Sequence, residues 1–155
     1  MNEVALSKPR VLPPKGLLIA LASQVPLLWA ALPLRPSVVE VALGAVLCSI
    51  GVCLNVWADA LFRRNDVGVC PFTHVPVVVE GGPYRITRNP MYVGLVCLNL
   101  GVTFFTGVLG NIWSSIALLL WLHYAFVLPE EQFLRRNLAA IYDRYSKRAP
   151  RWLIY

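Results

Sequence analysis

Long apolar runs separated by polar segments of unequal length dominate this chain. The four runs extend over about Leu17 to Leu34, Val38 to Phe62, Met91 to Val108 and Ile112 to Leu128. Each is close to the roughly 20 residues that a helix needs to cross the hydrocarbon core of a bilayer. The pattern therefore predicts an all-α integral membrane protein with about four transmembrane helices, and the length of 155 residues fits a single domain over residues 1–155.

Composition and charge agree with this topology. Hydrophobic residues make up 57% of the chain and charged residues only 14%, which is unusual for a soluble domain. Of the 14 basic residues, 13 lie on one side of a four-span arrangement, beginning with Lys8 and Arg10, and only Arg35 lies opposite. The positive-inside rule then places both termini in the cytoplasm. Contact with anionic membrane lipids accounts for the net charge of +6, so we expect no nucleic-acid partner.

The second and third spans are joined by a polar segment, residues 63–90, on the predicted cytoplasmic side. It ends in GGPYRITRNP, where Gly81-Gly82-Pro83 predicts a turn. Asn89 and Pro90 then predict the N-cap and the first residue of the third long helix. A loop of this length is usually functional or disordered, and its Pro, Val and aromatic residues argue against disorder.

A different helical pattern follows the fourth span. Pro129, Glu130 and Glu131 predict a break or kink at the end of the span. Beyond it, apolar side chains recur at helical spacing, which predicts an amphipathic helix on the cytoplasmic side. The residues of this apolar face are Leu134, Leu138, Ile141, Tyr142 and Tyr145.

Charged residues at these two segments have both a structural and a functional interpretation. Glu130 and Glu131 could complement a helix dipole, or one could bind a cation or the ammonium group of a ligand. Arg85 and Arg88 could meet lipid phosphates, or grip a carboxylate or phosphate group. The sequence leaves both alternatives open.

Other polar residues give weaker signals. Asn55 and Asp59 share a helix face within the second span, and Asp59 either marks a site or reaches the interface. His123 in the fourth span is a hydrogen-bonded structural residue or a proton carrier. Cys70 and His74 form a C-x3-H pair without a second ligand pair, so we assign no metal. No P-loop, G-x-S-x-G or dinucleotide-binding fingerprint occurs, which disfavours phosphoryl transfer, hydrolysis and Rossmann-type redox chemistry.

Two motifs resemble those of a known membrane enzyme superfamily. GGPYRITRNPMYVG is similar to the G-P-Y-x-x-x-R-(H/N)-P-x-Y-x-G motif of the isoprenylcysteine carboxyl methyltransferase and phospholipid methyltransferase superfamily. EEQFLRRNLAAIYDRY resembles its second motif, E-E-x-x-L-x-x-x-F-G-x-x-Y-x-x-Y. The resemblance covers about residues 70–152, and the two motifs occur in the expected order.

The resemblance implies methyl transfer from S-adenosylmethionine to a lipophilic acceptor at the cytoplasmic membrane face. The cytoplasmic loop and the C-terminal amphipathic helix would form the cofactor pocket, and Arg88 or Glu131 would position the acceptor as the catalytic residues. By motif position, one wall of the pocket would be Gly82, Tyr84, Arg88, Asn89, Pro90 and Tyr92, and another would be Glu130 and Glu131, closed by Tyr142 and Tyr145.

Departures from the motifs bear on the acceptor. Asn89 stands where the prenylcysteine enzymes typically have His, Leu138 and Ala139 replace Phe-Gly, and Pro76 replaces a frequent His. The acceptor therefore stays open between an isoprenylcysteine-like carboxylate, a lipid amine and similar groups. The R-N-P form resembles bacterial members, which implies a bacterial inner membrane.

Two rival functions follow from the same features. A membrane reductase that uses NADPH, similar in architecture to the sterol reductases, is the rival enzyme. The other is a small helical membrane protein without activity, whose basic rim recruits lipid or a partner.

Overall fold

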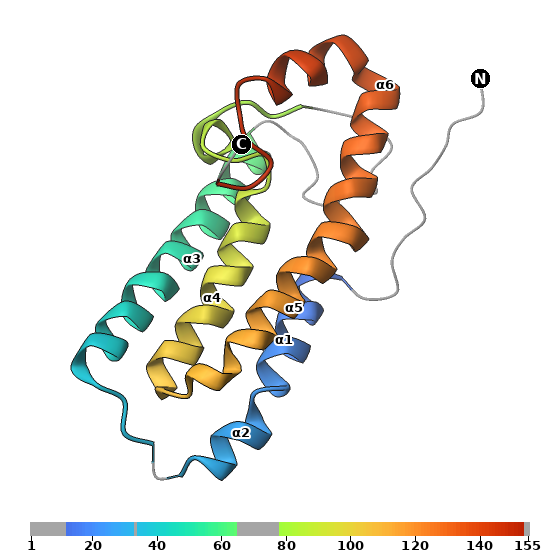
Figure 1. Cartoon of the computed structure of the whole chain (residues 1–155). Coiled ribbons are helices and arrows are strands. Elements are labelled where there is room, and N and C mark those ends of the chain that lie inside the picture. The colour runs from blue at the N-terminus through green and yellow to red at the C-terminus, as the bar shows by residue number, and fades with distance from the viewer. Residues whose placement is uncertain (1–11, 33, 65–77, 154–155) are drawn as a thin grey trace.

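The apolar runs form helices, and no strand occurs among the residues that the structure describes. The computed structural model describes residues 12–32, 34–64 and 78–153. In the elongated bundle of Figure 1, α4 packs against α1, α3 and α5. The all-helical fold is therefore as predicted. The elements are α1 Pro13–Ala22, α2 Val25–Ala30, α3 Val38–Arg64, α4 Pro90–Thr106, α5 Ile112–Leu122 and α6 Leu128–Ser146, with 3-10 turns η1 Gly82–Arg85 and η2 Leu109–Asn111 and a π-helical turn η3 His123–Val127.

The predicted spans differ in how well they correspond to single helices. Among the described residues, the helices Val38–Arg64 and Leu109–Ser146 are long and apolar enough to cross a membrane, and the apolar α4 is shorter at 17 residues. The first predicted span is instead two helices of 10 and 6 residues. An unbroken helix would bring the ring of Pro26 against the carbonyl four residues earlier, at Ala22, where α1 ends. The first predicted span is therefore not one continuous helix.

The break predicted at Pro129 is also wrong. The helix that begins at α5 continues through η3 into α6, and Pro129 lies in the first turn of α6. In a π-helical turn each backbone N–H binds the carbonyl five residues earlier instead of four. The N–H that Pro129 lacks just after this turn is therefore tolerated. The backbone departs from helical angles only at Leu138, with φ −133° and ψ 38°. The kink therefore lies nine residues later than predicted.

Helices α3 and α4 approach each other closely because glycines face each other. A Cβ on Gly51 would lie 2.7 Å from the carbonyl oxygen of Gly94, and one on Gly44 would lie 2.9 Å from that of Gly101. Small residues let helix backbones pack at short range in membranes. Asn55 donates to the Gly51 carbonyl of its own helix at 2.8 Å. Asp59 pairs with exposed Arg63 at 2.8 Å, which agrees with the interpretation that Asp59 reaches the interface.

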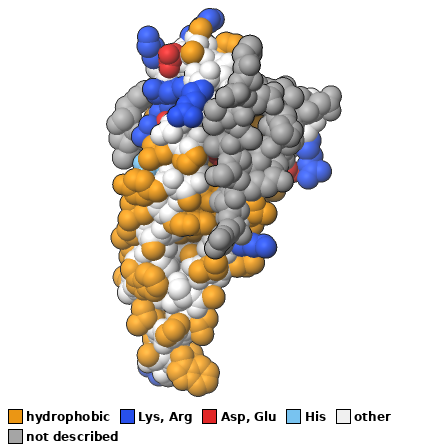
Figure 2. Space-filling model, turned by 90° about the vertical axis from the view of Figure 1, so that its right-hand side faces the viewer, with side chains coloured by type: hydrophobic (Ala, Val, Ile, Leu, Met, Phe, Trp, Pro, Cys, Tyr) orange, Lys and Arg blue, Asp and Glu red, His pale blue; other side chains and the backbone are white. Residues whose placement is uncertain are grey.

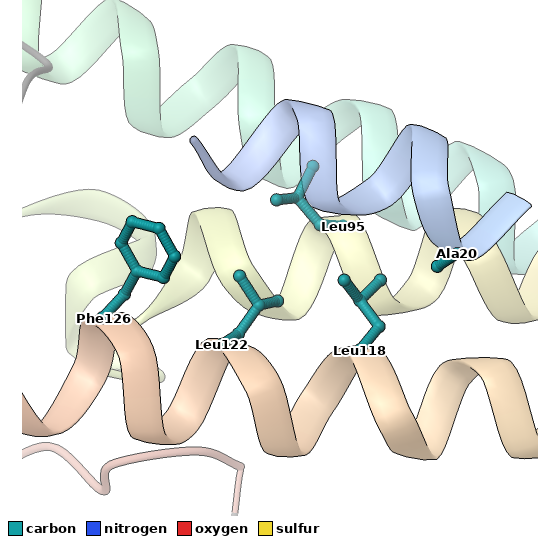
Figure 3. Close-up of a cluster of buried hydrophobic side chains, with 5 residues drawn as sticks. All are labelled: Ala20, Leu95, Leu118, Leu122 and Phe126. Carbon is teal, nitrogen blue, oxygen red and sulfur yellow. The ribbon is translucent and has the colours of Figure 1, made fainter. Parts of the chain in front are cut away.

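Two apolar clusters divide the interior. One lies along the bundle and comprises Ala20, Leu95, Leu118, Leu122 and Phe126, drawn in Figure 3. The other lies where η1 meets the far end of α6 and comprises Ala58, Tyr84, Tyr142, Tyr145 and Ala149. Both sequence motifs therefore contribute to the second cluster.

Charged side chains gather at one end of the molecule. Figure 2 shows apolar side chains over the body of the bundle and most of the Lys and Arg side chains near the top. That end is built from the last turn of α3, which contains Arg63 and Arg64, together with η1 and α6. Residues Lys8, Arg10, Cys70, His74 and Pro76, on which some sequence-based expectations rest, lie outside the described residues.

A buried polar network crosses the apolar part of the bundle. The Oδ1 atom of Asn99 on α4 accepts hydrogen bonds from Ser115 at 2.7 Å, Ser114 at 2.9 Å and Gln24 at 3.3 Å. Gln24 and Asn99 are fully buried. Gln24 lies at the turn between α1 and α2, so the network fixes the broken first span against α4 and α5.

Replacing Asn99 with Leu should destabilise the protein. The substitution removes the acceptor that three buried donors share, although Gln24 keeps Ser114 Oγ and Ser114 keeps the carbonyl of Asn111. An unsatisfied buried polar group costs about 1 to 3 kcal/mol. We expect a clear fall in the unfolding temperature in detergent. As a control, Asn137→Leu changes an exposed side chain that bonds only to its own helix and should have little effect. Equal unfolding temperatures for the two variants would contradict the structural role of the network.

Candidate cofactor site

The first motif forms a tight turn followed by a helix start. Gly82 has a φ of 55°, in the left-handed region that glycine adopts easily. Pro83 and Tyr84 are buried in η1. The predicted helix start is confirmed, because Asn89 is the N-cap of α4 and Pro90 is its first residue. The Asn89 side chain does not cap α4, however, and donates from Nδ2 to the carbonyl oxygen of Arg151 at 2.7 Å.

An ion pair joins the two motifs. Arg88 Nη1 lies 3.0 Å from Glu131 Oε1, and both side chains are largely buried, with 11% and 8% of their surfaces exposed. The same Nη1 donates to the hydroxyl of Tyr142 at 3.0 Å. The guanidinium carbon of Arg88 also lies 5.9 Å from the centre of the Tyr142 ring, within cation–π range. The structure thus brings Arg88, Glu131 and Tyr142 together, as the motifs predicted.

A second arginine, missed by the sequence-based prediction, binds the same carboxylate. Arg151 donates from Nε to Glu131 Oε1 at 3.0 Å and from Nη2 to Oε2 at 2.8 Å. This two-point geometry is the strong form of the arginine–carboxylate pair. Hydrogen bonding to Glu131 raises the pKa of Arg151. In the sequence Arg151 is one basic residue among many near the second motif. Only its position shortly after that motif could have distinguished it.

The adjacent carboxylate, Glu130, has different surroundings. It accepts a hydrogen bond of 2.6 Å from the hydroxyl of Tyr92. Within the described part of the chain, no ion pair is formed by Glu130. The Tyr92 ring lies 6.0 Å from that of Phe126, which belongs to the apolar cluster of the bundle. Glu130 therefore lies where the charged end meets the apolar interior.

The remaining predicted residues have mainly structural contacts. The Tyr145 hydroxyl donates to the backbone carbonyl of Tyr84 at 2.8 Å, which ties α6 to η1. Burial raises the pKa of Tyr84 well above its ordinary value, so it stays neutral. Gly82 lies against Trp57 of α3, where an added Cβ would come within 3.0 Å of the indole nitrogen. Gly82 therefore shapes the turn.

The described residues have the chemistry to hold S-adenosylmethionine. The cofactor carries a carboxylate, an ammonium group, a sulfonium and an adenine ring. Arg88 Nε is a buried donor that has no hydrogen-bond partner among the described residues, and a buried donor usually has one. Glu130 supplies a carboxylate for positive charge, and the tyrosines supply aromatic faces.

The chain matches the family model described as phospholipid methyltransferase over residues 39–141. No curated protein and no solved structure matches the chain. The match covers well over half of the 155 residues, so the chain belongs to the phospholipid methyltransferase family.

Membership of this family decides between the functions considered from the sequence. The protein is an S-adenosylmethionine-dependent methyltransferase of the membrane, and its methyl acceptor is a lipid. The predicted superfamily and cofactor are therefore confirmed. The match ends before Tyr142, Tyr145 and Arg151, so the family model does not cover these three residues of the cluster.

Replacing Glu131 with Gln should destabilise the protein, because two arginines lose their counter-charge. Breaking a buried ion pair costs about 3 to 5 kcal/mol, and the partial exposure of Arg151 reduces this to about 2 to 3 kcal/mol. The measurement is the free energy of unfolding in detergent. Glu80→Gln is the matched control, because Glu80 pairs with exposed Arg148 at 3.7 Å. Equal free energies of unfolding for the two variants would contradict the structural role of Glu131.

Proposed function

We propose that this protein transfers a methyl group from S-adenosylmethionine to the head-group amine of a phospholipid at the cytoplasmic face of the membrane. The observation that carries the proposal is the convergence of both motifs, through Arg88 and Glu131, at the charged end of a membrane helix bundle. The family match supports a phospholipid as the acceptor in preference to an isoprenylcysteine-like carboxylate. The one-sided distribution of basic residues supports cytoplasmic termini.

The two adjacent glutamates would have different roles. Glu131 is compensated by two guanidinium groups, so it has little capacity left for a further cation. Glu130 has the hydroxyl of Tyr92 as its hydrogen-bond donor. Burial raises the pKa of Glu130 to about 7, so a cation bound beside it would favour the charged carboxylate. We therefore assign the ammonium or sulfonium of the cofactor to Glu130, with Tyr92 fixing the orientation of its carboxylate.

The carboxylate of the cofactor would meet the opposite side of the cluster. Arg88 Nε offers a buried donor, and the first turn of the 17-residue helix α4 offers backbone N–H groups and the positive end of a dipole. Tyr142, stacked near Arg88, would add an aromatic face. These groups lie close to the start of α4, where the first motif ends.

The chemistry places modest demands on the protein. The bound cofactor supplies a methyl group already activated on a sulfonium. Glu130, Tyr92 and Arg88 would hold it so that an acceptor amine, after losing its ammonium proton to water, approaches in line. The N–CH3 bond would form as the S–CH3 bond breaks, and S-adenosylhomocysteine would leave with the electron pair on its sulfur. Orientation of this kind can supply about 7 to 11 kcal/mol of a barrier.

Replacing Glu130 with Gln should weaken cofactor binding with little effect on folding. Loss of a charged hydrogen bond of about 1.5 to 3 kcal/mol corresponds to about a tenfold or larger rise in Kd. The measurement is calorimetric titration with S-adenosylhomocysteine, alongside the unfolding temperature. Tyr92→Phe should give a smaller rise, because the carboxylate remains. Unchanged affinity in Glu130→Gln would refute the assignment.

The acceptor can be identified directly. Protein in vesicles of phosphatidylethanolamine, supplied with methyl-labelled cofactor, should produce labelled lipid with the methyl group on the amine nitrogen. Vesicles of phosphatidylglycerol, which has no amine, serve as the control and should stay unlabelled. Binding of S-adenosylhomocysteine without labelled phosphatidylethanolamine would exclude this amine as the acceptor, and mass spectrometry of the extracted lipids would then show which other molecule carries the label.

A further inference from the structure

The last described part of the chain, residues 147–153, folds back across the start of α4 (Figure 1). We call it the return segment. The backbone N–H of Arg88 donates to the carbonyl of Pro150 at 2.9 Å, and Thr87 Oγ1 donates to that of Arg151 at 3.1 Å. With the bond from Asn89 to the same carbonyl, three successive residues before α4 bind this segment. The return segment is therefore built into the site.

Arg151 is held in place independently of its own side chain. On one side, Ala149 is buried in the cluster with Tyr142 and Tyr145. On the other, Trp152 packs against the apolar cluster of the bundle and lies 6.1 Å from the ring of His123. The backbone bonds to the carbonyls of Pro150 and Arg151 do not involve the guanidinium. A change at the Arg151 side chain should thus leave the path of the chain intact.

We propose that Arg151 is a positioning residue that makes Arg88 a selective binder of the cofactor's carboxylate, an inference that rests on the proposed function. Glu131 Oε1 is shared by Arg88 and Arg151, each at 3.0 Å. The two bonds from Arg151 fix the plane of the carboxylate. That plane in turn fixes Arg88, which then presents Nε as a buried donor.

Charge leads to the same conclusion. The ion-paired group of Arg88, Arg151 and Glu131, counted without the neighbouring Glu130, has one excess positive charge. Without Arg151, Glu131 would neutralise Arg88 alone, and the excess charge would disappear. Arg151 therefore supplies both the orientation and the electrostatic preference for an anionic group, although it does not touch the ligand.

The test compares two ligands that differ by one carboxylate. S-adenosylhomocysteine carries the group, and decarboxylated S-adenosylhomocysteine lacks it. In Arg151→Gln we expect the Kd of S-adenosylhomocysteine to rise about tenfold, a change typical of a lost charged contact. The Kd of the decarboxylated ligand should change by less than about threefold on the same scale. Arg151→Lys keeps the charge without the planar two-point contact and should be intermediate, and it serves as the second variant if Arg151→Gln does not fold.

The control is Arg148→Gln, which removes the same charge from an exposed position in the same segment and should leave both affinities unchanged. An equal loss of affinity for both ligands in the Arg151 variants, or no loss for either, would overturn the role of Arg151. An unchanged ratio of the two Kd values together with a raised KM for the lipid would also overturn it. That result would mean that the excess positive charge binds a lipid phosphate. Failure of the wild-type protein to bind S-adenosylhomocysteine would refute the proposed function itself.

Discussion

The carboxylate of Glu131 holds together three parts of the chain that are far apart in the sequence. It binds Arg88 just before α4 and Arg151 in the return segment, and it lies itself in the first turn of α6. A buried carboxylate is stable only with compensating charge and hydrogen bonds, and here two arginines supply both. The positions of the α4 start, α6 and the chain end are therefore interdependent, and the candidate site lies at their junction.

The rest of the bundle presents this junction at the boundary between polar and apolar surroundings. Facing glycines bring α3 and α4 close together, and the network around Asn99 fixes the turn of the broken first span. The π-helical turn η3 lets α5 continue past Pro129 without a break. The acidic pair Glu130 and Glu131 thereby stays on a rigid helix, and each carboxylate meets a different set of partners.

Local signals in the sequence predicted the parts of the structure that depend on local chemistry. Pro90 begins a helix because its fixed φ and missing N–H suit the first helical position. The contact between Arg88 and Glu131 followed from the paired motifs. The position of the kink did not, because the effect of Pro129 depends on the π-helical turn before it. Gln24 and Asn99 were missed because single amides in apolar runs show no periodic pattern, and Arg151 because only tertiary contacts distinguish it from other basic residues.

The central claim is that both motifs form one cofactor site between Glu130 and Arg88. A crystal structure of the protein with S-adenosylhomocysteine bound tests it most directly. The account predicts the ligand's ammonium within hydrogen-bonding distance of Glu130, its carboxylate beside Arg88 Nε, and Arg151 still bound to Glu131. A ligand bound elsewhere on the bundle, or Arg88 and Glu131 separated from each other in the complex, would contradict it.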